Sequence, residues 1–263
     1  MDDLEFLSQN LEQFKKQNIS FMECLPKLQD ALKMALQVPV TSETDHFVLV
    51  LSKLCVDRLQ DIFILCSQNR GDGTMPLVRA MFEGLVNACY ISAHPEKSED
   101  FKRYALIFIK KVQGQTETLT GRTANPKIKK SIEDALSKYV DADGKLSVPQ
   151  HDWTKVNLID RAKDVGLGHA VVDAYYKTIE VAHPSMIHAH SQSKRVGKIN
   201  YIFRGADEFN KQKIKEALFI SHYLAIEVLC LLHRTFKNDV LCTYIEECNE
   251  GFRGLCSEAL SDL

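Results

Sequence analysis

Three polar residues at intervals of four interrupt an otherwise apolar stretch, and their types can bind anions and move protons. Arg79, Glu83 and Asn87 follow the i, i+4, i+8 spacing that aligns side chains along one face of an α-helix, and Tyr90 falls on the same face. An arginine fork suits a phosphate or a developing anion, and a glutamate can orient a base or accept a proton. These four residues, the Arg79 stripe, therefore predict a polar site.

A second polar stripe comes later in the chain, directly before a proline. Asp173, Tyr176, Glu180 and His183 share one helical face if the helix is regular. The proline after His183 is expected to end this helix, which leaves His183 and Ser185 at its terminus. The stripe thus supplies a histidine and a hydroxyl group that a reaction could use.

If the two stripes face each other, they form one site suited to metal-independent cleavage of RNA or of a nucleotide. His183 would act as the general acid or base, because imidazole titrates near neutral pH. Glu83 would orient it or accept a proton, and Arg79 would hold the phosphate. The predicted substrate-binding residues are Asn87, Tyr90, Tyr176, Glu180, Ser185, Lys194 and Arg195.

The same set resembles helical ribonucleases that use arginine and histidine at close spacing. The match is partial, because no arginine in this chain is followed by a histidine four to six residues later. In a second hypothesis, His183, His188 and His190, spaced H-x4-H-x-H, bind a divalent metal ion together with Glu83. No cofactor is predicted, since the chain has no P-loop, dinucleotide fingerprint or G-x-S-x-G elbow.

A third interpretation gives the Arg79 stripe no ligand at all. Arg79 and Glu83 would then form a structural ion pair, either at a solvated edge or in a buried network. Lys194 and Arg195 belong to a short basic loop that could contact phosphates or could simply form a solvated surface. The residues leave three alternatives open: a nucleotide or RNA ligand, a protein partner, or neither.

The Arg79 stripe is expected to lie on a helix spanning residues 74–94. Thr74 is a suitable N-cap, and the proline after His94 marks the end of the helix. Apolar side chains occupy most of the other faces, which is typical of a buried helix. A row of small residues that includes Gly84 runs beside the polar stripe and would let another helix approach closely.

The periodicity of apolar residues predicts helices along almost the whole chain. Residues 70–73 are expected to form a turn, and residues 196–203 a short strand or an extended loop. The apolar face of the helix after Pro95 is expected to include Phe101, Tyr104, Ile107, Phe108 and Val112. The other predicted helices span residues 2–17, 19–36, 42–66, 95–118, 126–139, 152–165, 168–183, 207–236 and 238–250, with a last piece through residue 260.

These elements predict an all-α fold class. We expect a single irregular multi-helix bundle of roughly eight to ten helices. No internal repeat or linker divides the chain, so residues 1–263 are expected to form one helical domain. Residues 1–40 would be an N-terminal helical extension of that domain.

Composition excludes some classes of protein. Lys and Arg number 33 against 35 Asp and Glu, so the chain lacks the overall positive charge of many nucleic-acid-binding proteins. The N-terminus has no signal-peptide pattern, and the most apolar run, residues 217–232, is too short to cross a bilayer. Eight cysteines without a C-x-x-C pair favour buried thiols in a reducing compartment. We expect a soluble, cytoplasmic protein without a membrane partner.

Two short motifs extend the argument to a family. The first is Leu77-Val78-Arg79-x2-Phe82-Glu83-x3-Asn87-x2-Tyr90, followed by Phe101-x2-Tyr104, and the second is Tyr176-x6-His183-Pro184-Ser185. Together they resemble a bacterial all-helical family catalogued as domain of unknown function five-six-seven-seven, over roughly residues 45–235. The resemblance implies an all-α fold and no established activity. Such helical proteins are associated with bacterial toxin and phage-defence systems, which is an association and not a mechanism.

Two functional hypotheses follow. In the leading one, the protein is an intracellular helical effector whose polar site, built on Arg79, Glu83 and His183, binds or cleaves RNA or a nucleotide. In the alternative, it is a non-catalytic helical scaffold or protein-interaction module, and the same residues form a buried structural network. A site needs exposed or unsatisfied polar groups, whereas a structural network satisfies its own hydrogen bonds.

Overall fold

The computed structural model describes residues 3–123, 125–140, 152–182, 193–196, 200–203 and 206–261. The fold is all-α, as predicted, with one antiparallel hairpin of two strands, β1 (Ser193–Val196) and β2 (Asn200–Phe203). The helices are α1 (Asp3–Gln17), α2 (Ile19–Ala35), α3 (Glu43–Ser67), α4 (Gly71–Ala93), α5 (Ser98–Thr120), α6 (Pro126–Ser137), α7 (Leu158–Asp164), α8 (Lys177–Ala182), α10 (Ala206–Phe236) and α11 (Val240–Ser261). Three shorter helical turns are η1 (Pro95–Lys97), η2 (Gly168–Ala170) and η3 (Val172–Tyr176).

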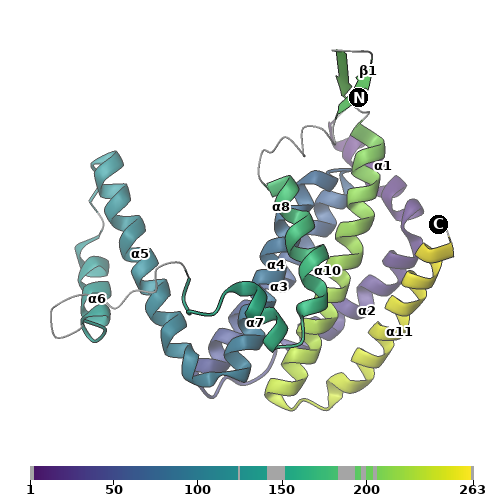
Figure 1. Ribbon diagram of the computed structural model, residues 1–263. Coiled ribbons are helices and arrows are strands. Elements are labelled where there is room, and N and C mark those ends of the chain that lie inside the picture. The colour runs from purple at the N-terminus through teal and green to yellow at the C-terminus, as the bar shows by residue number, and fades with distance from the viewer. Residues whose placement is uncertain are drawn as a thin grey trace.

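Helix α4 forms the centre of the core. It packs most extensively against α3, and α10 covers both helices (Figure 1). The prediction of a buried helix is confirmed, because apolar side chains on several faces of α4 are almost fully excluded from water. They are Met75, Val78, Met81, Phe82, Leu85, Val86 and Ile91.

Helices α3 and α4 approach closely at Gly84, as the row of small residues predicted. A Cβ atom placed on Gly84 would lie 3.2 Å from the sulfur of Cys55 on α3. The Cys55 thiol in turn donates to the backbone carbonyl of Met81 over 3.3 Å. Burial raises the pKa of Cys55 to about 12, so the thiol keeps the proton that it donates.

Gly84→Val is expected to lower the free energy of unfolding by about 1–3 kcal/mol, because the added side chain must push α3 away from α4. Gly114→Val on α5 is the matched control, since a Cβ there meets no atom within 4 Å. The control should change stability by less than about 0.5 kcal/mol. Urea unfolding of both variants measures the difference, and equal destabilisation would contradict the close approach as the cause.

Helix α4 begins at Gly71, one turn earlier than predicted. The predicted turn at residues 70–73 is therefore mostly the first turn of the helix. Thr74 lies inside the helix, where its hydroxyl donates to the Gly71 carbonyl over 2.5 Å, so its assignment as N-cap was wrong. Helix α3 is capped by Ser42, whose hydroxyl accepts a hydrogen bond from the Asp45 amide.

Two other helix limits differ from the predictions. Helix α11 continues through Gly251, where a break was expected after residue 250. A Cβ on Gly251 would lie 2.9 Å from the sulfur of Cys24 on α2, so packing against α2 accounts for the glycine. The helix predicted from residue 152 begins only at Leu158, after Asn157 caps it.

Helix α5 departs from the body of the molecule and pairs with α6 (Figure 1). Its first turns pack as predicted, with the ring of Phe101 against Trp153 and Phe47. The outer part of this apolar face is not covered: Phe108 and Val112 are exposed. An apolar stripe alone could not show where the helix leaves its neighbours.

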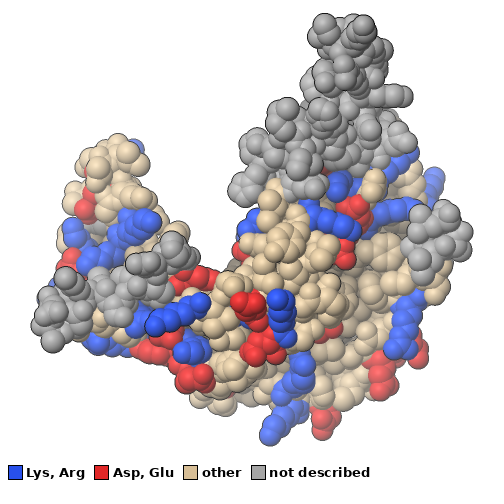
Figure 2. Space-filling view, viewed as in Figure 1, with Lys and Arg blue, Asp and Glu red and all other residues tan. Residues whose placement is uncertain are grey.

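The surface carries both signs of charge. Lys and Arg lie among Asp and Glu over the face seen in Figure 2, without a large area of one sign. This distribution agrees with the nearly balanced composition. In the part of the chain that the structure describes, none of the helices is long and apolar enough to cross a membrane.

Candidate anion-binding site on helix α4

Arg79 is held in place from two sides. Its Nε donates to the Glu83 carboxylate over 2.8 Å, and its Nη2 donates to the Tyr175 hydroxyl over 3.4 Å. The guanidinium carbon lies 4.5 Å from the centre of the Tyr175 ring, within the range of a cation–π interaction. The side chains of Arg79 and Glu83 remain 23% and 39% exposed, so a ligand can reach a guanidinium that is already oriented.

The partner of Arg79 is Tyr175 and not Tyr176. Residues Val172–Tyr176 form a π-helix, in which the Lys177 amide bonds to the Val172 carbonyl five residues back. This wider turn shifts the register of the helix, so Tyr175 contacts α4 and Tyr176 is half exposed. The face that Tyr176 was expected to share with Asp173 assumed a regular helix, which this segment is not.

Part of the second stripe lies outside the described residues. The backbone of Glu180 belongs to α8, which packs against α4, but its side chain is not described. The other predicted members, His183, Ser185, His188 and His190, fall in residues 183–190, which the structure does not describe. The proposed metal site at the three histidines and the proposed role of His183 therefore stay predictions.

The predicted basic residues Lys194 and Arg195 lie on strand β1. They stand opposite Ile202 and Tyr201 in the hairpin register. Only their backbone is described, so their role as substrate-binding residues also stays a prediction.

Asn87 and Tyr90 both contact Trp153, which lies in the segment before α7. The Trp153 indole donates to the Asn87 side-chain oxygen over 3.2 Å. The Tyr90 ring packs edge-on against the indole at 5.8 Å, and Tyr90 itself is 6% exposed. This end of the Arg79 stripe is therefore covered, whereas the Arg79 end stays partly open.

A second arginine lies beside the stripe and is buried. Arg161 on α7 is 1% exposed, and its guanidinium carbon lies 5.0 Å from the Trp153 ring. Its Nη2 donates to the Asp152 carboxylate. Among the described residues, nothing accepts a hydrogen bond from its Nε or Nη1. A buried cation with two spare donors is unusual, because each unmade hydrogen bond costs about 1–3 kcal/mol.

The charges around Arg161 link it to the stripe. Burial lowers the pKa of its guanidinium, and Asp152, Tyr90 and Glu83 each offset part of that effect. Glu83 thus acts on both Arg79 and Arg161. We refer to Arg79, Glu83, Arg161 and their contacts Asn87, Trp153 and Tyr175 as the two-arginine site.

Sequence reasoning missed Arg161, although the sequence carries a sign of it. Arg161 shares the i, i+3, i+4, i+7 face of its helix with Leu158, Ala162 and Val165, which all point toward the core. A charged residue on an otherwise apolar stripe is buried unless its helix leaves the core. Burial of a charge in turn requires a partner, which the structure identifies as Asp152.

His94, which sequence reasoning assigned only to the end of the helix, contacts Tyr90 at the end of the Arg79 stripe. Its Nε2 lies 2.7 Å from a carboxylate oxygen of Asp164 on α7, and its ring lies 4.5 Å from that of Tyr90. A histidine paired with a carboxylate is a common arrangement for proton transfer. His94 is about one-third exposed, so this pair is accessible from solvent.

Comparison with protein families finds a match between residues 45–198 and the model of DUF5677, a family of unknown function. The matched segment contains every residue of the two-arginine site. The match starts at residue 45, as the resemblance indicated, and ends at residue 198, before the limit of roughly residue 235 that the resemblance gave. No curated protein and no solved structure matches the chain.

Proposed function

The chain belongs to DUF5677, a family of unknown function, so we infer its function from the chemistry of the site itself. We propose that the two-arginine site binds a phosphate-bearing ligand, either a nucleotide or RNA. Arg79 would be the first contact, since it is oriented but partly exposed. Arg161, which is buried beside the stripe, would supply further donors. Arginine suits this role because its fork matches the oxygens of a phosphate.

The observation that carries the proposal is that two nitrogens of Arg161, Nε and Nη1, have no acceptor among the described residues. A closed structural network would leave no buried donor without an acceptor. A phosphate offers several acceptor oxygens and a negative charge, which would satisfy Nε and Nη1 together. Glu83, which is partly exposed and acts on both arginines, links the buried Arg161 to the partly exposed Arg79.

A more specific form of the proposal is cleavage of the bound RNA or nucleotide. His183 would then serve as general acid or base, with Glu83 orienting it, as the sequence suggested. The protein would act as a cytoplasmic effector in a bacterial toxin or phage-defence system.

Growth of a bacterial host that expresses the wild type or Arg79→Met tests this role. Toxicity or phage protection that Arg79→Met loses would support it, and a wild type without either effect would contradict it.

The alternative is a non-catalytic scaffold, which one observation favours. The contacts of Asn87 and Tyr90 with Trp153 join α4 to the segment before α7, and the pair of Arg161 with Asp152 joins that segment to α7. Such contacts are what a structural network requires. In that case Arg79→Met would change stability and leave binding of RNA and nucleotides unaltered.

RNA binding by Arg79→Met is expected to be weaker and less sensitive to salt than binding by the wild type. Each phosphate that the variant can no longer neutralise should reduce the slope of log K against log salt by about 0.7 for single-stranded RNA. Filter binding of an RNA oligonucleotide at several salt concentrations measures both quantities. Thermal melts of the same proteins establish that they are folded.

Arg58→Met on α3 is the matched control for this experiment. Arg58 also forms a helical ion pair, with Asp61 at 2.8 Å, and is 41% exposed. It should keep the wild-type affinity and salt slope. Equal binding by Arg79→Met and Arg58→Met would contradict a phosphate contact at Arg79.

A further inference from the structure

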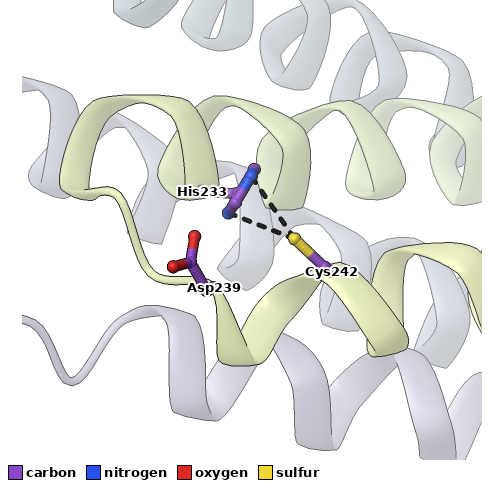
Figure 3. Close-up of side chains that lie close together, drawn as sticks. All are labelled: His233, Asp239 and Cys242. Atoms are coloured by element: carbon purple, nitrogen blue, oxygen red, sulfur yellow. Dashed lines mark hydrogen bonds between the residues drawn. The ribbon is translucent and has the colours of Figure 1, made fainter.

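A histidine, a carboxylate and a thiol meet where α10 turns into α11. His233 lies on the last turn of α10, Asp239 in the connection, and Cys242 on the first turn of α11 (Figure 3). One ligand atom from each residue lies within 4.8 Å of the others. The three side chains point toward one space from both sides of the turn. All three types are zinc ligands.

The hydrogen bond of His233 leaves the correct nitrogen free. Its Nδ1 lies 2.9 Å from the backbone carbonyl oxygen of Asn238, and a carbonyl only accepts, so Nδ1 carries the proton. In the neutral ring Nε2 then has the lone pair, and Nε2 is the nitrogen nearer to the Cys242 sulfur, at 3.6 Å against 3.9 Å for Nδ1. A histidine that binds a metal usually donates its other N–H to a carbonyl or carboxylate in this way.

The distance between the two ligand atoms fits a shared metal ion. Nε2 of His233 and the sulfur of Cys242 are 3.6 Å apart. A zinc ion at about 2.1 Å from nitrogen and about 2.3 Å from sulfur, with a tetrahedral angle between them, holds these atoms about 3.6 Å apart. The sulfur lies beside the ring, at similar distances from both nitrogens, so binding requires a rotation of the His233 or Cys242 side chain that brings the sulfur toward the Nε2 lone pair.

We propose that His233, Asp239 and Cys242 bind a zinc ion. The carboxylate and the thiolate together neutralise the charge of Zn²⁺, and the thiol releases its proton on binding. Three protein ligands leave the fourth tetrahedral position open to water or to a group from another molecule. The ion would fasten the start of α11 to the end of α10.

The local backbone explains why these residues converge. Lys237 adopts a left-handed conformation with φ of 50°, which ends α10 and reverses the chain within a few residues. Cys242 lies in the first turn of α11, and a helix N-terminus favours negative charge such as that of a thiolate. The spacing H-x5-D-x2-C contains one cysteine, so a search for paired cysteines does not find it. The site lies outside the two-arginine site and is independent of its function.

Metal titration of the reduced full-length protein tests the proposal. Zn²⁺ is titrated in competition with a chromophoric chelator, and Co²⁺ is used as a spectroscopic probe. The wild type should bind one ion per chain, and Co²⁺ should give the charge-transfer band of a single thiolate. Cys242→Ser should abolish the band, and both Cys242→Ser and His233→Gln should weaken Zn²⁺ binding at least about tenfold.

Cys256→Ser is the control, because Cys256 lies on α11 outside the cluster. It should retain the band and the wild-type affinity for Zn²⁺. Zn²⁺ should also raise the melting temperature of the wild type and of Cys256→Ser, but not that of Cys242→Ser. The proposal is overturned if Cys242→Ser binds Zn²⁺ as tightly as the wild type, or if the band persists in it.

Discussion

Asp152→Ala is expected to lower the free energy of unfolding by about 3 kcal/mol, because it leaves the Arg161 cation buried without a charged partner. Arg161 is 1% exposed, and Asp152 is its hydrogen-bonded carboxylate. With Asp152 removed, three nitrogens of the guanidinium would lack acceptors among the described residues. Urea unfolding of the wild type and the variant measures the change.

The reverse substitution should cost much less. In Arg161→Met the apolar side chain replaces a buried charge, and the Asp152 carboxylate can be hydrated because it is 35% exposed. The double variant, Asp152→Ala with Arg161→Met, should therefore recover most of the stability that Asp152→Ala loses. A double variant no more stable than Asp152→Ala alone would contradict the account of a stranded cation.

Acid is expected to destabilise the protein through His222, which is buried on α10. The imidazole is 3% exposed and stacks on Phe252, with the ring centres 5.7 Å apart, and Phe21 packs edge-on against it. Its Nε2 has no hydrogen-bond partner among the described residues. Burial alone lowers the pKa of His222 from 6.5 to about 4, because the charged form cannot be solvated there.

The direction of the pH effect follows from that shift. Above pH 6.5 the ring is neutral in both the folded and the unfolded chain, so His222 contributes no pH dependence. Between pH 6.5 and about 4 the unfolded chain binds a proton that the folded chain does not, so stability falls as the pH falls. The full effect is about 3 kcal/mol and is reached below the folded-state pKa.

His222→Phe isolates this contribution. The variant keeps the ring contacts and removes both nitrogens, and the adjoining apolar pocket lined by Leu25, Leu59 and Phe63 can take up the larger ring. Urea unfolding at pH 7 and pH 4 should show a smaller decrease in stability for His222→Phe than for the wild type, by about 3 kcal/mol. His222→Leu should behave alike. Parallel decreases in all three proteins would contradict a buried neutral histidine.

Local periodicity was sufficient to predict the parts of the site that lie on one helix. The i, i+4 spacing of Arg79 and Glu83 fixed their pairing, and the apolar faces around them fixed the burial of α4. The row of small residues at Gly84 correctly indicated a close neighbour. These features depend on residues within a few turns of one another, which is the range over which a sequence pattern is informative.

The parts contributed by other elements could not be predicted in this way. A π-helix inserted before α8 brought Tyr175 to Arg79 in place of Tyr176, and no residue pattern marked it. Arg161 reaches the site because the segment from Trp153 to α7 folds against α4. His233 and Cys242 meet because of a left-handed residue in the turn between two helices. Each case depends on tertiary packing or on one backbone angle.

The fluorescence of Trp153 during titration with ribose 5-phosphate tests the central claim most directly. Trp153 is the sole tryptophan and contacts both Asn87 and Arg161, and this phosphate ester does not absorb where tryptophan is excited. The account predicts a saturable change in the wild type and in Arg58→Met, and its absence in Arg79→Met and Arg161→Met. A wild type that shows no change, or an equal change in all four proteins, would contradict phosphate binding at the two-arginine site.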